Sequence, residues 1–262
     1  MMRTAAMSAL IRSDLHPLAD ASWRRQCRAQ LDQHGALVLR QFIQPAALQM
    51  MIAEGDAQRH QAYHTISKHN VYLMPADKAY SADHPRNRDV TSTKGCITDD
   101  VIAADSPLRQ LYNDALFQHF LCDVLGEAAL YPYADPLSSI NVHYAPDGQE
   151  LGWHFDNSSF AITLLLQKPR AGGVFQYVKD LRDADAGEMN FDGVAAVLDQ
   201  RRPVEALAIE AGDLVLFRGR NSLHRVTPTE GDITRMLAVL AYNTQPGIAL
   251  SESARMTFYG RL

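Results

Sequence analysis

Residues 152 to 167 read GWHFDNSSFAITLLLQ, and they place two metal-binding side chains directly before an apolar run. His154 and Asp156 are two positions apart, so on one strand both side chains point to the same face and can hold one ion together. Residues 160 to 167 have the length and composition of a buried strand. This stretch predicts a β-rich fold that carries a metal centre.

Short runs of the same kind continue on both sides of this stretch. In chain order they are ALYPY (129–133), SSINVHYA (138–145), FAITLLLQ (160–167), GVFQYV (173–178), VEALAIEA (204–211), DLVLF (213–217) and MLAVLAYN (236–243). Gly, Pro and Asp residues separate them, and one segment with helical character, residues 182 to 202, interrupts them. Many short strands at turn-marked spacing predict a mainly β fold with flanking helices, a double-stranded β-helix (jelly roll) of cupin-like type.

The N-terminal part has a different pattern. Residues 20 to 34 predict a helix that Asp20 caps, and Pro45 opens a second helix after the short apolar run ALVLRQF. Residues 106 to 126 predict one further helix. Residues 61 to 105 are polar and contain HNVYLM as their one convincing strand, which favours a long loop-rich stretch that acts as a lid.

These patterns predict one domain over residues 1–262. We expect residues 1–128 to form a helical and loop-rich N-terminal support and lid, and residues 129–262 to form the jelly-roll core. A chain of 262 residues with 47% hydrophobic and 21% charged residues is within the range of one globular domain.

The composition argues against several partners. The net charge is −5 and no window concentrates Lys and Arg, so nucleic acid is not expected as a partner. No stretch approaches the ~18 apolar residues of a membrane span, which predicts a soluble cytoplasmic protein without a membrane partner. Cys27, Cys96 and Cys122 form no CxxC pair, which argues against a disulfide framework or a zinc ribbon. A homodimer is one open alternative for the assembly.

Two further residues complete a metal-binding pattern. The segment GDLVLFRGRNSLHRVTP supplies His224 just after a strand, and Arg235 begins another strand eleven positions later. Two imidazoles and one carboxylate form the facial triad of non-haem Fe(II) oxygenases, which leaves positions for a keto acid and O2. Arg235 would bind the far carboxylate of 2-oxoglutarate as a bidentate donor. A non-redox cupin-like binding protein or isomerase is the alternative, but it would give Arg235 no role.

Three blocks carry a resemblance to a known family. They are SSINVHYAPDGQELGWHFD, AGGVFQYVKDLRDA and AGDLVLFRGRNSLHRVTPTEGDITRMLAVLAYNTQPG, within residues 138–247. They resemble the Fe(II)/2-oxoglutarate-dependent oxygenases and, within them, the free-amino-acid halogenases and hydroxylases typified by the bacterial lysine halogenases. The resemblance implies a dioxygenase that uses Fe(II), 2-oxoglutarate and O2, acts on a small molecule such as an amino acid, and forms succinate and CO2.

The residue two positions after the first histidine divides this group. The radical halogenases have Gly there, which opens a site for chloride, whereas this chain has Asp156. The carboxylate occupies that position, so hydroxylation is the favoured outcome. Halogenation, desaturation and cyclisation stay open as alternatives, as does an amino acid bound to a carrier or a peptide.

Four residues are candidates for contacts with the substrate. Arg88, close to Arg86 in the polar segment, would bind a substrate carboxylate, or it would form a surface salt bridge. Asn141 and His143 share one face of a strand that points into the barrel mouth or into solvent. Asn157 stands where the lysine-modifying relatives have an acidic contact, which implies a different substrate or pose, and a role in a turn is the alternative.

Overall fold

The computed structural model describes residues 9 to 262. The helices are α2 (Ala21–His34), α3 (Pro45–Gln58), α4 (Pro107–Tyr112), α5 (Ala115–Leu125), α6 (Phe191–Leu198) and α7 (Glu252–Tyr259), with 3-10 turns η1 (Arg59–Gln61) and η2 (Asp99–Val101). The strands are β1 (Ala36–Leu39), β2 (Tyr63–Asn70), β3 (Asp89–Ile97), β4 (Ile140–Ala145), β5 (Leu151–His154), β6 (Ala161–Gln167), β7 (Ala171–Gly172), β8 (Phe175–Val178), β9 (Glu205–Leu207), β10 (Leu214–Phe217), β11 (Leu223–Val226), β12 (Thr229–Glu230) and β13 (Arg235–Leu240). None of the described helices is long and apolar enough to cross a membrane.

Two antiparallel sheets form the centre of the molecule. The larger has seven strands in the order β1-β10-β6-β13-β4-β3-β2, and the smaller has four in the order β5-β11-β8-β9. Phe217 of the large sheet packs against Phe175 and Tyr177 of the small one, so the two sheets face each other. The predicted jelly roll with flanking helices is confirmed.

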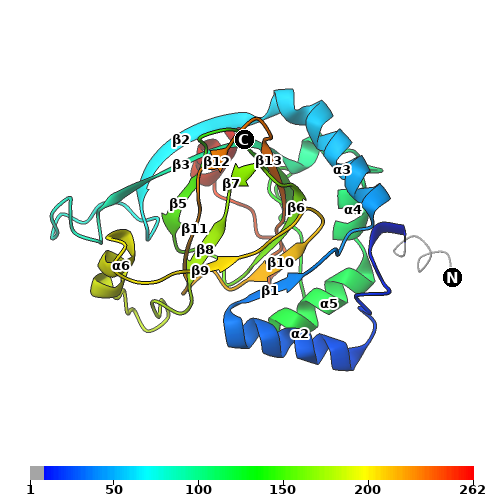
Figure 1. The fold of residues 1–262 in the computed structure, drawn as a ribbon, viewed down its shortest axis with the longest axis horizontal. Coiled ribbons are helices and arrows are strands. Elements are labelled where there is room, and N and C mark those ends of the chain that lie inside the picture. The colour runs from blue at the N-terminus through cyan, green and yellow to red at the C-terminus, as the bar shows by residue number, and fades with distance from the viewer. Residues whose placement is uncertain (1–8) are drawn as a thin grey trace.

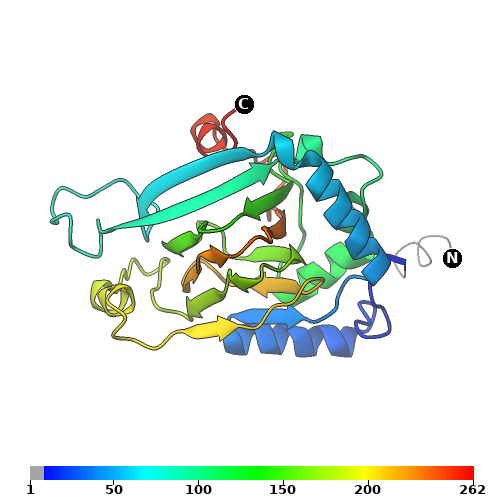
Figure 2. The same ribbon diagram turned by 45° about the horizontal axis from the view of Figure 1, so that its top comes forward.

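The outer face of the large sheet forms the main hydrophobic core with the N-terminal helices. Alternate side chains of β4, β6, β10 and β13 point to this side, for example Val142, Leu164 and Leu216, and meet Leu31 and Phe120 of the helices. Figures 1 and 2 show α2, α3, α4 and α5 along this side of the sheet. The residues between them, such as His143, therefore face the small sheet.

The outer face of the small sheet is covered by α6 and by the segment after β2. Trp153, Phe155 and Leu223 pack here against Val194 of α6 and against Tyr72. In Figure 2, α6 and the loop between β2 and β3 extend on the same side of the barrel. With Trp153 and Leu223 turned outward, the neighbouring positions of β5 and β11 point between the two sheets.

The interpretation of residues 61–105 as loop-rich is wrong. The segment contains β2 and β3, which pair from Tyr63 with Cys96 to Asn70 with Asp89, and β3 also pairs with β4. Only His69 and Asn70 of the predicted strand HNVYLM belong to β2. The sequence did not predict these strands because most residues on both of their faces are polar, so apolar and polar residues do not alternate along them. The division into a support of residues 1–128 and a core stays a prediction.

The helix predicted over residues 106–126 is two helices. Asp114 interrupts it, because its side chain accepts a hydrogen bond from the backbone N–H of Phe117 (2.9 Å) and so starts α5 as an N-cap. Ser106 caps α4 and Gly126 ends α5. The predicted strand 129–133 is reduced to a single bridge between Tyr131 and Asn243.

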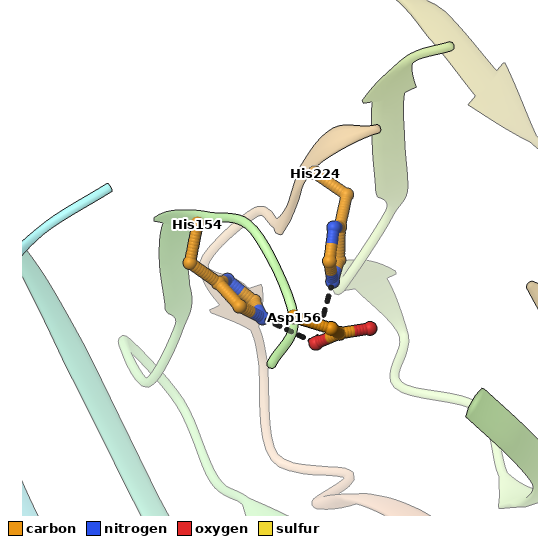
Figure 3. A group of neighbouring side chains, drawn as sticks. All are labelled: His154, Asp156 and His224. Atoms are coloured by element: carbon orange, nitrogen blue, oxygen red, sulfur yellow. Dashed lines mark ion pairs between the residues drawn. The ribbon is translucent and has the colours of Figure 1, made fainter. Parts of the chain in front are cut away.

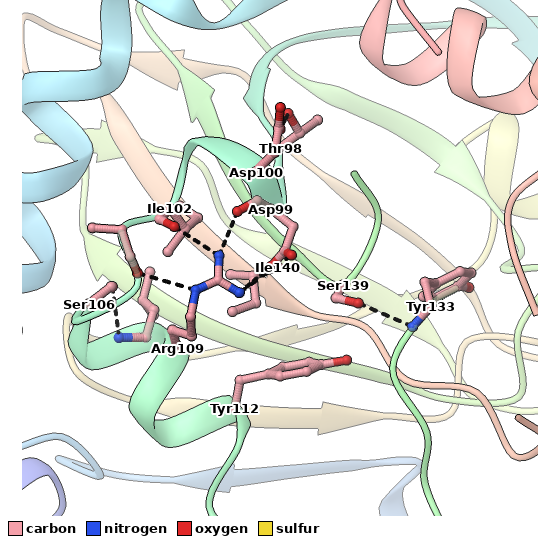
Figure 4. Close-up of polar contacts among 12 residues, drawn as sticks. Thr98, Asp99, Asp100, Ile102, Ser106, Arg109, Tyr112, Tyr133, Ser139 and Ile140 are labelled. Atoms are coloured by element: carbon pink, nitrogen blue, oxygen red, sulfur yellow. Dashed lines mark hydrogen bonds and ion pairs between the residues drawn. The ribbon is translucent and has the colours of Figure 1, made fainter. Parts of the chain in front are cut away.

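Arg109 ties α4 to the turn that follows β3. Its guanidinium donates to the backbone carbonyls of Asp99 (2.6 Å) and Ile102 (2.8 Å) and forms an ion pair with the Asp99 carboxylate (3.2 Å). Figure 4 shows the guanidinium enclosed by these oxygen atoms. Burial raises the pKa of Asp99, and the charge of Arg109 offsets this only in part. The turn and the helix therefore depend on one side chain.

Candidate metal centre

Two neighbouring strands of the small sheet place His154 and His224 side by side. His154 is the last residue of β5 and pairs directly with His224 on β11. The register shifts between this pair and the pair of Leu151 with Val226, which is a β-bulge. Because directly paired residues of antiparallel strands point to the same face, both imidazoles lie between the sheets, with ring centroids 4.1 Å apart. His224 was expected just after a strand, whereas it lies on one.

The backbone fixes the orientation of both rings. His154 Nδ1 lies 2.8 Å from the carbonyl oxygen of Gly152, and His224 Nδ1 lies 2.9 Å from that of Ser222. A carbonyl oxygen only accepts, so each Nδ1 carries the proton and each Nε2 keeps a free lone pair. This is the tautomer that a metal-binding imidazole needs.

Asp156 joins the two histidines from beyond the end of β5. The expectation that His154 and Asp156 lie on one strand is wrong, because the backbone N–H of Asp156 donates instead to the carbonyl of Gly219, 3.1 Å away. Its Oδ1 lies 3.6 Å from His154 Nε2 and 3.4 Å from His224 Nε2. Figure 3 shows the carboxylate and both imidazoles converging on one point.

A glycine makes room for this carboxylate. A Cβ atom built on Gly219 would lie 1.8 Å from Oδ2 of Asp156, closer than any real contact. The same Oδ2 is buried and has no hydrogen-bond partner among the described residues. A buried carboxylate oxygen without a partner is costly unless a cation or a donor completes it.

The charges of the three groups suit a cation. Burial alone would raise the pKa of Asp156, but the neighbouring His224 and His154 more than offset it and hold the pKa far below its ordinary value. Burial, together with His224, lowers the pKa of His154. Near neutral pH the site therefore holds an ionised carboxylate and a neutral His154.

These observations fit a metal ion. One ligand atom from each of the three residues lies within 4.8 Å of the others. Two imidazole nitrogens and one carboxylate oxygen are the donor set of the non-haem Fe(II) triad. The buried Oδ2 of Asp156, which has no partner among the described residues, also fits a bound cation. His154, Asp156 and His224 could therefore hold Fe(II), as the sequence predicts.

Arg235 begins β13 and is 7% exposed. Burial lowers the pKa of its guanidinium to about 10, and its Nε has no hydrogen-bond partner among the described residues. Arg235 lines a cavity of about 270 Å³ together with Phe175, whose ring centroid lies 5.6 Å from that of His224. A Cβ on Gly173 would lie 2.9 Å from Arg235 Cδ, so this glycine leaves space for the side chain. The guanidinium thus shares a cavity with a ring neighbour of His224, and no ion pair with a described residue neutralises it.

The two candidates on β4 have different surroundings. The amide of Asn141 donates to the carbonyls of Leu137 (2.8 Å) and Ile140 (2.9 Å) and accepts from the hydroxyl of Tyr259 (3.0 Å). Its hydrogen-bonding groups are thus engaged within the protein. The ring of His143 has no hydrogen-bond partner within residues 9–262, and burial followed by the nearby Lys94 and Arg235 keeps its pKa well below the ordinary value.

The other two candidates lie at the surface. Arg88 forms an ion pair with Asp199 at 2.5 Å, which is the surface salt bridge considered from the sequence. Asn157 is exposed, and its carbonyl accepts a hydrogen bond from Arg220 (3.2 Å). Arg86 differs from Arg88, because it is 7% exposed and its Nη1 has no partner in the described part of the chain.

Sequence reasoning missed two residues beside the triad. His69 of β2 lies edge-on to His154, with ring centroids 6.4 Å apart, and its Nε2 is 2.7 Å from the hydroxyl of Ser92. That hydroxyl accepts from the N–H of Gly152, whose carbonyl orients His154. No local sequence signal could have found them, because β2 and β3 reach β5 only through the arrangement of the sheets.

Solved structures share this fold. The chain is similar to an oxidoreductase of the 2OG-Fe(II) oxygenase family from Burkholderia pseudomallei, with 16% identity and a TM-score of 0.52 over 86% of this chain and 92% of that chain. It is also similar to a prolyl-4-hydroxylase from Pseudomonas putida (12%, TM-score 0.51, 83% and 98%) and to the alpha-ketoglutarate-dependent carbocyclase SnoK from nogalamycin biosynthesis (12%, TM-score 0.58, 91% and 92%). The fold is that of the 2-oxoglutarate- and Fe(II)-dependent oxygenases.

A family model narrows the class. The model described as Halogenase D matches residues 19–256, and the chain belongs to this family. No match was found among curated proteins. The chain thus combines the Halogenase D family, the fold of the 2-oxoglutarate- and Fe(II)-dependent oxygenases and a His-Asp-His cluster that could hold a metal ion.

Proposed function

We propose that this enzyme hydroxylates an unactivated C–H bond of a small substrate, a free amino acid or a derivative of one. His154, Asp156 and His224 hold the iron, and Arg235 binds the cosubstrate. The observation that carries the proposal is the triad, in which the buried Oδ2 of Asp156 has no hydrogen-bond partner in the described part of the chain, together with a buried Arg235 whose Nε also has none there. The bound iron and 2-oxoglutarate supply the oxidising chemistry, with succinate and CO2 as products.

The protein's own groups prepare the site before the reaction. The two backbone carbonyls keep the Nε2 atoms of His154 and His224 free of protons, and Asp156 stays ionised because its pKa is lowered. The rings of Phe175 and Phe217, with centroids 5.6 and 4.8 Å from that of His224, shield this ligand from water.

Arg235 orients the cosubstrate in this proposal. A guanidinium presents a planar pair of donors that matches one carboxylate, and its charge persists at neutral pH even with the pKa at about 10. The glycines of the segment 171–173 leave the cavity beside it open. The far carboxylate of 2-oxoglutarate would satisfy the free Nε of Arg235, while its keto-acid end points to the triad.

Asp156 favours transfer of oxygen over transfer of halide. Its carboxylate stands where the halogenases that the chain resembles have Gly and bind chloride. Gly219 and the backbone contact between the two residues hold Asp156 in this place. A halide would need the space and the charge that the carboxylate takes.

The substrate contacts come from the loop between β2 and β3 and from the inner face of β4. Arg86 is a better candidate than Arg88 for a substrate carboxylate, because Arg88 is paired with Asp199 while Arg86 is buried with a free Nη1. His143 has an unpartnered ring on the inner face. Asn157 offers an amide, not a carboxylate, at the mouth of the site.

The test is a screen of free amino acids with iron-loaded enzyme, 2-oxoglutarate and O2. Mass spectrometry follows products that gain one oxygen atom, and succinate is measured in the same samples. We expect one amino acid to yield both in equal amounts, and His224→Ala to yield neither. If free amino acids do not stimulate the release of succinate but an amino acid bound to a carrier or a peptide does, the substrate is the bound amino acid.

Radical halogenation is the second candidate, and the family description Halogenase D favours it. It predicts a chlorinated product when the screen contains chloride. We expect no chlorinated product from the natural enzyme, and we expect Asp156→Gly to lose hydroxylation. Asp156→Asn, which fills the same space, is the matched control. Chlorination by the natural enzyme would overturn the hydroxylase proposal.

A further inference from the structure

The inner face of the large sheet carries three basic residues on adjacent strands. Cys96 on β3 pairs with His143 on β4, so Lys94, two positions before Cys96, points to the same side as His143. Arg235 on β13 pairs with Ala145, two positions after His143, and so also points to this side. The face that looks toward the triad thus bears Lys94, His143 and Arg235.

Lys94 has no anionic partner. No hydrogen bond or ion pair connects its ammonium to any residue between 9 and 262, and the nearest defined contact is the ring of Phe258 on α7, 5.5 Å from Nζ to the centroid. The side chain is partly buried, and burial lowers its pKa. A partly buried ammonium that faces the interior without a counter-charge favours an anionic ligand beside it.

Lys94 and Arg235 are separate positions. The strand β4, which carries His143, lies between β13, which carries Arg235, and β3, which carries Lys94. The two cations therefore lie on opposite sides of His143. Arg235 lies at the cavity beside the triad, and Lys94 lies toward α7.

The strand that carries Lys94 runs beside a strand of the triad. Ser92, two positions before Lys94 on the same face, accepts a hydrogen bond from Gly152 of β5 (3.0 Å). Two residues of a strand span about 7 Å, so the ammonium belongs to the same interior as the metal ligands. A small molecule that places a C–H bond at the triad can reach Lys94 with another group.

We propose that Lys94 binds a carboxylate of the primary substrate in addition to the carboxylate proposed for Arg86, which makes the substrate an acidic amino acid or another diacid. This inference rests on the proposed function, because it needs the cosubstrate to occupy Arg235. A carboxylate would accept a charge-assisted hydrogen bond from the ammonium. The neutral ring of His143 lies beside it and can donate a second one. The other source of a carboxylate at Lys94 is 2-oxoglutarate itself.

The experiment compares acids with their amides on enzyme that cannot turn over. Protein loaded with Mn(II) and saturating 2-oxoglutarate is titrated by calorimetry with L-glutamate, L-glutamine, L-aspartate, L-asparagine, acetate and acetamide. We expect at least one acid to bind about tenfold or more tightly than its amide, as a hydrogen bond to a charged group contributes. Lys94→Met removes the difference, and Lys94→Arg restores most of it.

The controls separate the outcomes. Lys68→Met, on the exposed face of β2, leaves the preference for acids unchanged. The affinity for 2-oxoglutarate stays within twofold in Lys94→Met, and the variant melts close to the natural protein, because the substitution breaks no ion pair within residues 9–262. The inference is overturned if no acid in the panel binds more tightly than its amide or if Lys94→Met keeps the preference for acids. It is also overturned if Lys94→Met weakens the binding of 2-oxoglutarate. A protein that shows no Fe(II)-dependent binding of 2-oxoglutarate contradicts the proposed function instead.

Discussion

The carboxylate of Asp156 is held by a neighbouring connection and not by its own strand. β5 ends at His154, and the segment after β10 supplies the carbonyl of Gly219 that accepts from the backbone of Asp156. The space for Oδ2 exists only because Gly219 has no Cβ. The position of the third ligand thus depends on a residue that has no ligand atom of its own.

Gly219→Ala tests this dependence. The new methyl group would displace the Asp156 carboxylate, because the two would otherwise lie 1.8 Å apart. We expect the affinity for Fe(II) to fall about 10- to 100-fold, as for other changes that misplace a ligand. Titration with Fe(II) under anaerobic conditions measures the affinity, and thermal melting shows that the fold persists. Unchanged affinity would mean that Asp156 does not bind the metal.

Arg235 should determine the affinity for the cosubstrate. Arg235→Met removes a charged bidentate donor worth about 1.5 to 3 kcal/mol, so the KM for 2-oxoglutarate should rise about 10- to 100-fold. Arg235→Lys keeps the charge but not the planar pair of donors, so its KM for 2-oxoglutarate should lie between those of the natural enzyme and Arg235→Met. Arg225→Met is the matched control, since Arg225 follows His224 but stacks on Trp153 at the outer face. An equal effect of both Met variants would contradict the role of Arg235.

At the scale of elements, the sequence predicted strands where an apolar run or an apolar period marks them. β4, β6, β10 and β13 each place residues such as Val142, Leu164 and Met236 in the main core, so their pattern is visible. β11 has four residues, and two of them are His224 and Arg225, so no apolar pattern marks it. β2 and β3 are polar on both faces and were missed for the same reason.

The candidate site was predicted in part. The spacing of His154 and Asp156 pointed to the cluster, although the two residues do not share a strand. Residues that reach the site from β3, such as Ser92 and Lys94, could not be predicted. Their positions follow from the pairing of β3 with β4 and from the contact of Ser92 with β5. Both are contacts between distant parts of the chain, so the local sequence does not predict them.

Arg109 is predicted to stabilise α4 and the preceding turn. Arg109→Leu removes the donors to Asp99 and Ile102 and leaves a carboxylate in a mostly buried place. We expect the free energy of unfolding to fall by about 2 to 3 kcal/mol in urea titrations. Arg170→Leu breaks an exposed ion pair with Asp232 and should change it by less than about 1 kcal/mol. Equal losses would show that the buried contacts do not matter.

At the scale of the whole molecule, the inner face of the large sheet carries the cations Lys94 and Arg235 and looks toward Asp156, the carboxylate of the triad. This arrangement suits anionic ligands and penalises further protonation of the interior. The effect is seen at His143, because burial and the charges of Lys94 and Arg235 keep its pKa well below the ordinary value.

The metal-free protein should therefore lose stability as the pH falls below about 6.5. In this range the unfolded chain protonates His143 while the folded protein does not, so unfolding takes up a proton. The contribution of this one group is up to about 1.4 kcal/mol per pH unit, and it vanishes above the unfolded pKa. Urea titrations from pH 5 to 8 measure the slope, and His143→Gln should reduce it. If the free energy of unfolding of His143→Gln changed with pH as steeply as that of the natural protein, the low pKa of His143 would be contradicted.

The central claim is that His154, Asp156 and His224 hold iron that binds 2-oxoglutarate, and absorbance spectroscopy tests it most directly. Anaerobic protein with Fe(II) and 2-oxoglutarate should show a visible metal-to-ligand charge-transfer band. His224→Ala should lose the band, while His119→Ala, which changes an exposed histidine on α5, should keep it. A natural protein without the band, or a folded His224→Ala variant with the full band, would contradict the account.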